Sequence, residues 1–161
     1  MLIGCDFSSR PNRHKAIVIA RGSVVGDVLT LDGLQLLTSL DAFADWLVQD
    51  HDWVGGFDFP FGLPRELVLD LGWPTDWLSC MRFYAGLERS QIRDRFAAFC
   101  AKRPTGGKFA HRATDRWAGS SSSMKWVNPP VAYMLHAGVP ALIDAGVCLL
   151  GLHAGDPGSL N

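Results

Sequence analysis

The pattern of apolar and β-branched residues at the start of the chain predicts three short strands. Leu2 to Asp6 is an apolar run that ends in an acidic residue, and Ala16 to Ala20 is rich in β-branched residues. The residues Arg21-Gly22-Ser23 are typical of a tight reversal. A third strand is therefore expected from Val24 to Leu31, with Gly26-Asp27 as a bulge. Short reversals between consecutive strands indicate an antiparallel meander.

A helix and a fourth strand are expected next. Ser39 can cap the helix and Asp41 is favourable in its first turn. One face of the helix would carry the apolar residues Leu40, Phe43, Trp46 and Leu47. The following run, Trp53 to Phe57 with Asp58 after it, is too apolar for an exposed edge strand. Because a helix connects it to the meander, this strand should run parallel to one of the earlier strands, most simply the first.

The remainder of the chain is mainly helical in pattern. Pro64 is placed to begin a helix at Arg65, since its fixed backbone angle suits a first helical turn. Further expected elements are two helical pieces within Thr75–Lys102 broken near Gly86, an ordered functional loop or a mobile one over Pro104–Lys125, short helices at Pro130–His136 and Val139–Ala145, and a fifth strand at Val147–Leu152. The four serines at 120–123 favour a flexible turn. The elements predict one α/β domain over residues 1–161, without an internal repeat.

Composition narrows the class of protein. With 161 residues, 48% of them hydrophobic and 19% charged, the chain has enough apolar side chains for one buried core and is not disordered in composition. Burial is the default expectation for its six tryptophans. Four scattered cysteines, Cys5, Cys80, Cys100 and Cys148, fit reduced core residues better than a disulfide frame or a zinc site. The chain has no basic leader and no apolar stretch near the ~18 residues of a membrane span, so a soluble cytoplasmic protein is expected.

The net charge of −1 conceals an uneven distribution. Residues 1–81 sum to −6, whereas residues 82–125 sum to +7. An acidic metal centre together with a basic surface for phosphate groups would produce such a division. A solvated basic helix face is the alternative interpretation of the positive segment.

Two aspartates are the main candidates for chemistry. Asp6 ends the first predicted strand and Asp58 ends the fourth. If these strands are adjacent and parallel, the two residues lie ~5 Å apart, one strand spacing. Carboxylates that close repel each other unless a divalent cation or a proton lies between them, and oxygen ligands favour Mg²⁺ or Mn²⁺. Such a pair suits phosphodiester hydrolysis, although an aspartate at a strand end also often caps a turn.

A second cluster is a candidate for substrate binding. Lys108, Arg112 and Lys125 can neutralise phosphate, Arg112 with two parallel hydrogen bonds. His111 can transfer a proton near neutral pH, and Asp115 completes the cluster. Mixed charges on an ordinary surface loop are the alternative explanation.

Four segments of the chain resemble a known family. They are GCDFSSRPNRHKAIVIA, GGFDFPFGLP, KFAHRATDRW and SSSMKWVNPPVAYMLHAGVPAL, and together they extend over residues 1 to about 155. They resemble the DUF 429 family, which is described as predicted nucleases of ribonuclease-H-like fold. The resemblance implies a meander, helix and strand order with catalytic aspartates on strands one and four, matching Asp6 and Asp58.

The resemblance also raises two expectations about what this chain lacks. Ribonuclease-H-like enzymes usually use a third or fourth acidic residue, for which Asp115 and Asp156 are the candidates here. Similar family members continue past the length of this chain, so we expect its C-terminal closing elements to be missing.

Three hypotheses about function follow. The first is a metal-dependent nuclease that acts on RNA, DNA or another phosphate ester. The second is an ATP-binding domain related to the actin-like kinases, because Asp6, Ser8, Ser9 and Lys15 imitate their phosphate-binding residues. The third is a non-catalytic, truncated domain that binds a partner through a tryptophan-rich surface. The sequence leaves the oligomeric state open, and it lacks G-x-S-x-G, P-loop and G-x-G-x-x-G motifs.

Overall fold

The computed structural model describes residues 1–49 and 52–155, which form four strands and six helices. The chain divides into two compact units, and each is described here by itself. The sheet unit comprises residues 1–59 and 141–161, and the helical unit comprises residues 60–140. The single domain predicted over residues 1–161 stays a prediction. No helix among the described residues combines the length and the apolar character needed to cross a membrane.

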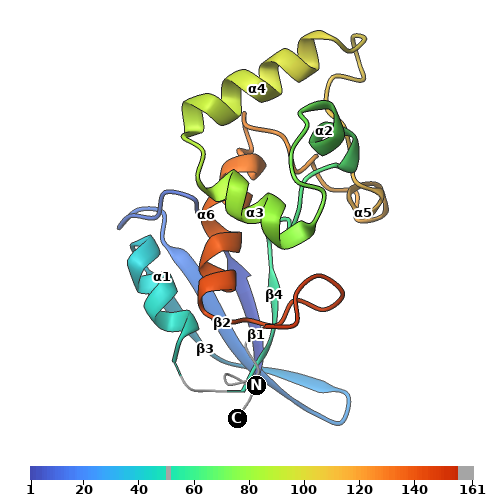
Figure 1. Ribbon diagram of the computed structural model, residues 1–161. Helices are drawn as coiled ribbons and strands as arrows, with labels where there is room; N and C mark the ends of the chain where they lie inside the picture. Colours follow the sequence, from blue (N-terminus) through green and yellow to red (C-terminus); the bar gives the residue numbers. More distant parts are fainter. Residues whose placement is uncertain (50–51, 156–161) are drawn as a thin grey trace. The chain divides into compact units, whose positions relative to one another are not determined.

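The sheet unit contains a mixed sheet of four strands (Figure 1). The strands are β1 (Leu2–Asp6), β2 (Ile17–Val25), β3 (Val28–Leu37) and β4 (Val54–Phe57), in the order β3-β2-β1-β4. β1, β2 and β3 are antiparallel neighbours, and β4 runs parallel to β1. The predicted α/β class, the meander and its parallel fourth strand are therefore confirmed.

One face of the sheet is closed by α1 (Leu40–Leu47), which contacts β3. Alternate residues of the strands point to this face, and Ile3, Cys5, Ile17, Ile19 and Leu37 are buried there. Phe43 and Trp46 of α1 are also buried. The helix begins as predicted, because the Ser39 hydroxyl accepts a hydrogen bond from the backbone N–H of Ala42 at 3.0 Å.

The hairpin between β2 and β3 differs from the prediction. β2 continues through Arg21-Gly22-Ser23, and the reversal comes at Gly26-Asp27, where Val25 pairs with Val28. Gly26 has φ +60°, the conformation that a two-residue hairpin loop requires at its first position. The irregularity in the pairing lies instead beside Arg21 and Gly22. The turn predicted at Arg21-Gly22-Ser23 is thus a strand segment beside a bulge, and the bulge predicted at Gly26-Asp27 is the turn.

Two expectations about the other strands were also wrong. β4 is at the edge of the sheet in the part of the chain that the structure describes, and Val54 is 72% exposed. Val147–Leu152 forms no strand, because the chain turns there and makes only an isolated bridge between Leu149 and His153. The hydrogen bond from Leu149 N–H to the carbonyl of His153 closes this turn on itself, so the apolar run cannot extend along β4.

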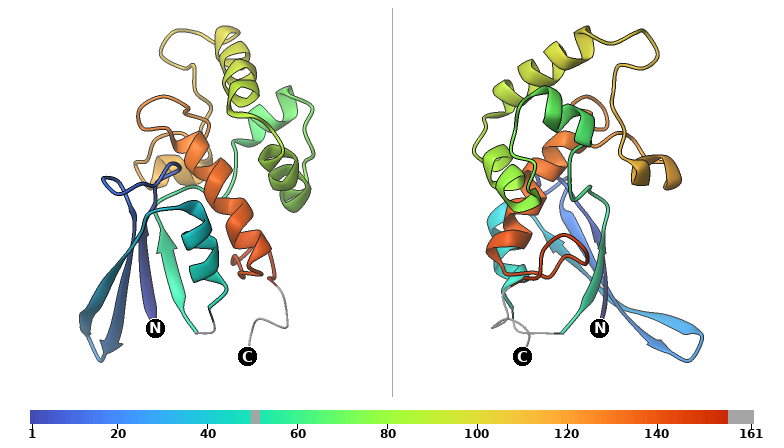
Figure 2. Two further views of the ribbon diagram at one scale, coloured as in Figure 1. Left: turned by 90° about the vertical axis from the view of Figure 1, so that its left-hand side faces the viewer. Right: turned by 45° about the vertical axis from the view of Figure 1, so that its right-hand side comes forward.

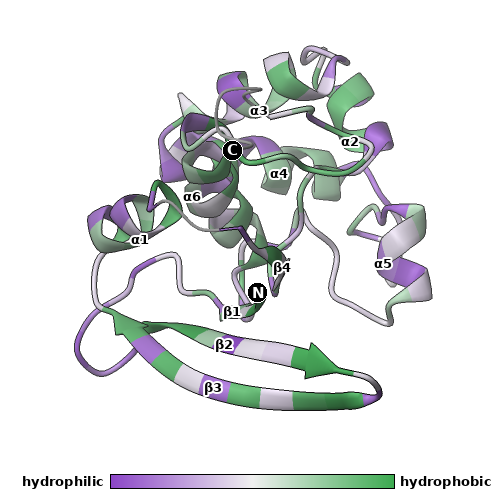
Figure 3. Ribbon diagram, turned by 90° about the horizontal axis from the view of Figure 1, so that it is seen from below, coloured by the Kyte–Doolittle hydropathy of each residue, from purple (hydrophilic) through white to green (hydrophobic). Residues whose placement is uncertain are grey.

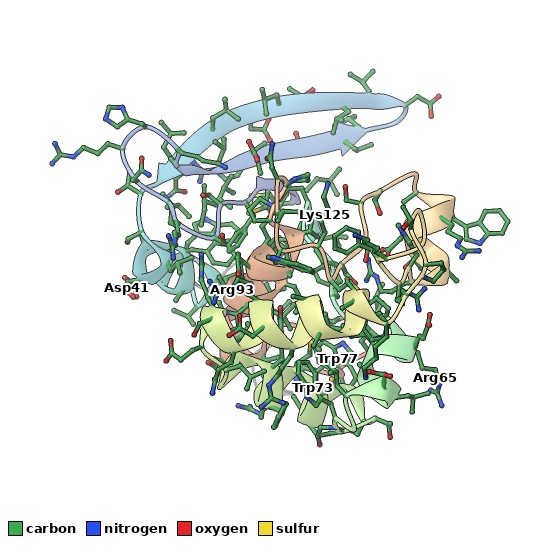
Figure 4. The ribbon with its side chains drawn as sticks, turned by 90° about the horizontal axis from the view of Figure 1, so that it is seen from above. Asp41, Arg65, Trp73, Trp77, Arg93 and Lys125 are labelled. Atoms are coloured by element: carbon green, nitrogen blue, oxygen red, sulfur yellow. The ribbon has the colours of Figure 1, made fainter. Side chains whose placement is uncertain are left out.

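Five helices lie wholly or partly in the helical unit: α2 (Arg65–Asp70), α3 (Trp77–Ala85), α4 (Arg89–Ala101), α5 (Ala113–Trp117) and the larger part of α6 (Val131–Asp144). The helix start at Arg65 and the break between α3 and α4 are confirmed. The core of this unit is aromatic. Trp73, which is labelled in Figure 4, has its ring 5.9 Å from that of Tyr84 and 6.1 Å from that of Phe96. The Tyr84 hydroxyl donates to the carbonyl of Ala132 in α6 at 3.0 Å, which joins α6 to α3.

Three further expectations are corrected by local packing. The two predicted C-terminal helices are one helix, α6, which continues through Pro140. The loop over residues 104–125 contains α5, and its serine run is not a wholly exposed turn, because Ser122 and Ser123 are buried. Cys148 is exposed, unlike the other three cysteines, since it lies in the turn that replaces the fifth strand.

Candidate functional site

Asp6 and Asp58 occupy equivalent positions at the ends of β1 and β4. Cys5 pairs with Phe57 in the parallel register, so each aspartate is the next residue along its strand. The backbone N–H of Asp58 donates to the carbonyl of Cys5 at 3.2 Å, which extends the ladder by one step. Since side chains alternate along strands, both carboxylates point to the face opposite Cys5, and both residues are exposed to solvent.

Aromatic residues hold both strand ends in place. Phe7 follows Asp6 and Phe59 follows Asp58, and their rings lie 4.7 Å apart in the buried core. Phe7 also contacts Phe43 of α1 at 5.2 Å. The buried ring on the carboxyl side of each aspartate fixes the backbone there. The two carboxylates are therefore preorganised by packing on the opposite face of the sheet.

The two carboxyl groups interact directly. The backbone N–H of Phe7 donates to Oδ1 of Asp58 at 2.8 Å. Partial burial, followed by the negative charge of Asp6 and a side-chain hydrogen bond with it, raises the pKa of Asp58, while the hydrogen bond from Phe7 acts in the opposite direction. The predicted juxtaposition is thus present in the structure.

Cys5 lies behind this pair and does not extend it. Burial first, and then the charges of Asp58 and Asp6, raise the pKa of the Cys5 thiol to about 12. The thiol is therefore protonated at neutral pH and is neither a nucleophile nor a metal ligand.

The raised pKa of Asp58 predicts a cost in stability at neutral pH. A carboxyl whose pKa is higher in the folded state binds its proton more tightly there than in the unfolded chain. Its stabilising contribution is present below the unfolded pKa of about 3.9 and is lost as the pH rises through the folded pKa. We expect Asp58→Asn to raise the thermal unfolding temperature at about pH 7 without metal, and not at about pH 3.

Differential scanning calorimetry of the two proteins at both pH values measures this effect. Asparagine keeps an oxygen that can accept the hydrogen bond from Phe7, so the comparison isolates the charge. Asp45→Asn, at an exposed position of α1, is the matched control and should show no such gain. A lower unfolding temperature for Asp58→Asn at neutral pH would contradict the prediction.

The donor set of the aspartate pair fits a magnesium-type ion. Mg²⁺ is commonly bound by one or two carboxylates, with water and substrate phosphate as its other ligands. Two solvent-accessible carboxylates at adjacent strand ends provide such a site. Among residues 1–49 and 52–155, no group of three or more His, Cys, Asp or Glu side chains gathers to hold a metal. Asp156, a candidate further ligand, lies outside the described residues.

The second predicted cluster is brought together within the helical unit. The Ser122 hydroxyl donates to the carbonyl of Ala110, and the N–H of Ala110 contacts the sulfur of Met124 at 3.3 Å. These contacts join the segment that carries Lys108, His111 and Arg112 to the segment that carries Lys125 (labelled in Figure 4). Lys108 and His111 are exposed, and Lys125 is half-buried.

Arg112 and Asp115 form an ion pair inside this cluster. Asp115 is fully buried, and its Oδ1 accepts hydrogen bonds from Nε and Nη2 of Arg112 at 2.9 and 2.6 Å. Its Oδ2 accepts from the backbone N–H of Arg112 at 2.9 Å, which caps α5. Both carboxylate oxygens of Asp115 are therefore used within the protein. We assign this pair to holding α5 in place, which leaves Lys108, His111 and Lys125 as the accessible members of the cluster.

Trp117 was missed as a candidate by reasoning from sequence. Burial is the usual expectation for tryptophan, and it holds for Trp46 and Trp73. Trp117, however, is 89% exposed at the end of α5, directly after the exposed Arg116. The signal available in the sequence was its position between Arg116 and a glycine–serine run, where few apolar neighbours exist to bury it.

Comparison with known proteins gives no match: neither a protein family, nor a curated protein, nor a solved structure is significantly similar to this chain.

Proposed function

We propose that this chain is a metal-dependent phosphodiester hydrolase of ribonuclease-H-like fold, related to the DUF 429 family and acting on RNA or DNA. The observation that carries the proposal is the pair formed by Asp6 and Asp58, which meet at the ends of adjacent parallel strands. The charge of Asp6 is one of the causes that raise the pKa of Asp58, after burial. A strand meander followed by a helix and a parallel strand supports the same fold. The Mg²⁺ or Mn²⁺ held by this pair would orient a phosphate oxygen and lower the pKa of a water molecule.

In this proposal the residues of the chain orient the two carboxyl groups and hold the two strand ends together. Because the pKa of Asp58 is raised, its carboxyl must lose a proton when the cation binds, so cation affinity should increase with pH. The Phe7 N–H keeps the Asp58 carboxyl in one orientation. The buried Phe7 and Phe59 rings prevent the strand ends from separating under the repulsion of two ionised carboxylates.

The helical unit supports nucleic acid as the substrate class. Its basic segment contains the exposed Lys108, His111 and Arg116, and contacts with phosphate groups dominate the affinity of proteins for nucleic acids. The exposed ring of Trp117 offers a face on which an unpaired base can stack. A small phosphate ester would not use this ring.

The kinase-like alternative receives less support from the structure. That alternative requires a lysine on the second strand to contact phosphate. Lys15 lies in the loop before β2, two residues short of Ile17. Ser8 and Ser9 are buried after β1, with the Ser8 hydroxyl accepting from the N–H of Arg10 at 3.4 Å.

The proposal is tested by cleavage of labelled single-stranded RNA, single-stranded DNA and bis-p-nitrophenyl phosphate with Mg²⁺ or Mn²⁺, each compared with a chelator. Chelator-sensitive cleavage of RNA or DNA is the expected result. Hydrolysis of the small diester alone would move the substrate class to small phosphate esters. Absence of any metal-dependent cleavage and of metal binding would overturn the proposal.

Replacement of Trp117 distinguishes nucleic acid from a small ester. Stacking of one base on an aromatic side chain is worth about 1–3 kcal/mol, so Trp117→Ala should weaken binding of single-stranded nucleic acid by roughly 5- to 150-fold. Trp117→Phe should retain most of the affinity, and Leu150→Ala, which alters a side chain that is 91% exposed, should have no effect. Fluorescence anisotropy with a labelled oligonucleotide measures these constants, and equal affinity for Trp117→Ala and wild type would contradict the expectation.

A further inference from the structure

The face of the sheet opposite α1 is apolar and open to solvent in the sheet unit. Figure 3 shows the long hairpin of β2 and β3 coloured largely as hydrophobic. The strand register places on this face the side chains Leu2, Val24, Leu29, Leu31, Leu34, Leu36 and Val54. We call these seven residues the apolar sheet face. Their exposed fractions run from 38% to 72%, although the leucine and valine side chains of a β-sheet usually pack against a core.

A bulge in β3 makes this face continuous. Leu31 and Leu34 are three residues apart, so regular alternation would point them in opposite directions. Leu31 pairs with Gly22 and Leu34 pairs with Ala20, with the irregularity in the pairing between them. The extra residue restores the alternation, and Leu29, Leu31, Leu34 and Leu36 project from one face, whereas Leu37 is buried on the other. The bulge therefore places these apolar side chains on one face of the sheet, whereas a regular strand would divide them between the two faces.

The tip of the hairpin is apolar on both sides. β2 and β3 continue past the last pair with β1, which is Leu2 with Gly22 (Figure 2). In the part of the chain that the structure describes, no third strand pairs with the hairpin at Val24, Val25, Val28 and Leu29. Val25 is 80% exposed and Val28 is 63% exposed on the side opposite Leu29. An exposed hairpin of this kind is a site of association.

The area of the apolar sheet face is large enough for a dimer. A fully exposed valine or leucine side chain presents about 100 Å² of apolar surface, so the seven side chains together present roughly 400 Å². Two copies packed face to face would bury roughly 800 Å² of apolar side-chain surface. Because interfaces are about 56–65% apolar, this corresponds to roughly 1,200–1,400 Å² in total, within the range of stable protein–protein interfaces.

The charges around the hairpin favour protein over lipid as the occupant. None of the seven residues of the apolar sheet face is charged, and the hairpin loop carries Asp27. The Asp6 and Asp58 carboxylates point to the same side of the sheet, at the other end of β1 and β4 from Leu2 and Val54. Surfaces that lie on membranes are rich in lysine and arginine. The hairpin instead contains one basic residue, Arg21, and two acidic residues, Asp27 and Asp32. An apolar patch without charges is complementary to its own copy, and twofold symmetric pairs are the commonest oligomers.

We propose that the apolar sheet face is a homodimer interface, in which two copies of this chain pack their sheets together around Leu29 and Leu31. The pair formed by Asp6 and Asp58 lies at the other end of β1 and β4 from the hairpin tip. The interface centre at Leu29 and Leu31 is therefore separated along the strands from the aspartate pair, although Asp6 points to the same face, in the row of Val18 and Leu36. Dimer formation does not depend on the proposed hydrolase activity.

Sedimentation equilibrium over a range of protein concentrations tests this inference. The wild type is expected to have the mass of a dimer at micromolar concentration. Leu29→Thr combined with Leu31→Thr keeps strand propensity while removing apolar surface, and should raise the dimer dissociation constant at least tenfold. Leu69→Thr combined with Leu150→Thr changes two exposed leucines outside the face and should leave the dissociation constant unchanged.

Three outcomes would overturn the inference. The first is a wild type that stays monomeric, whether or not it binds neutral phospholipid vesicles. The second is a mass that grows without limit as the protein concentration rises. The third is a dimer that both double variants retain equally. Circular dichroism of each variant establishes that it is folded. Manganese titration of Leu29→Thr/Leu31→Thr separates the two proposals, because loss of the dimer should leave metal binding by Asp6 and Asp58 unchanged.

Discussion

Replacing Asp6 or Asp58 by asparagine is expected to abolish Mn²⁺ binding and to reduce phosphodiester hydrolysis at least about a hundredfold. That factor corresponds to about 2.7 kcal/mol of lost transition-state stabilisation. The physical reason is that, among residues 1–49 and 52–155, two carboxylates converge at the ends of β1 and β4, so each supplies half of the ionic ligands there. An asparagine fills nearly the same space but cannot ionise, and it binds divalent cations weakly.

Isothermal titration calorimetry with Mn²⁺ and a cleavage assay under single-turnover conditions measure these losses. Asp45→Asn removes a carboxylate from an exposed position of the same unit and should change neither quantity. The double variant Asp6→Asn/Asp58→Asn should be no worse than either single variant, because both residues act on one ion. Full activity in either single variant would show that the aspartates only close turns at the strand ends.

Replacing Asp115 by alanine is expected to destabilise the helical unit by about 3 kcal/mol. Removal of one partner of a buried ion pair typically costs about 3–5 kcal/mol, because it leaves the other charge uncompensated. The lower end of that range applies here, since the Arg112 side chain is 25% exposed while that of Asp115 is 0% exposed. The change also removes the acceptor of the Arg112 N–H at the start of α5.

A second Arg–Asp pair in the same unit is the matched control. Arg93 and Asp94 are also hydrogen-bonded, at 2.8 Å, but both side chains are more than half exposed. Asp94→Ala should therefore change the free energy of unfolding by less than about 1 kcal/mol. Urea denaturation followed by tryptophan fluorescence measures both variants. Equal, small effects would show that Asp115 is not structural and would return it to the candidate substrate ligands.

The parts of the fold that alternation determines could be predicted from sequence. β1, α1 and β4 were placed correctly because an apolar run, a serine cap and an acidic strand end are all local signals. The parallel pairing of β4 with β1 followed from the intervening helix. The edge position of β4 could not be predicted, because an apolar strand has the same sequence pattern whether or not a neighbour covers it.

The position of the hairpin turn was predicted wrongly because glycine occurs both at the turn and at the bulge. Gly22 was expected in a turn, yet it is a strand residue whose lack of a side chain permits close approach, since a Cβ there would lie 2.7 Å from the carbonyl oxygen of Thr30. Gly26-Asp27 provides the turn because Gly26 adopts positive φ. Glycine marks both situations, and only the pairing partner distinguishes them.

The candidate site was predictable only where it depended on strand geometry. Asp6 and Asp58 were identified because matched strand ends bring them together. The pairing of Arg112 with Asp115 was not foreseen, although a spacing of three residues at a helix start permits it. Trp117 was not identified, because exposure of an aromatic side chain depends on what packs around it, and residue type alone does not determine that.

The alternation of Cys5-Asp6-Phe7 and Phe57-Asp58-Phe59 has a consequence for how this gene can change. Point substitutions that keep the residues on each side apolar leave the carboxylates in place. A one-residue insertion or deletion within β4 would exchange the faces of its side chains, sending Asp58 toward the core and Phe57 toward water. The spacing of this segment is consequently under tighter constraint than its composition, and length variation should accumulate in the loops instead.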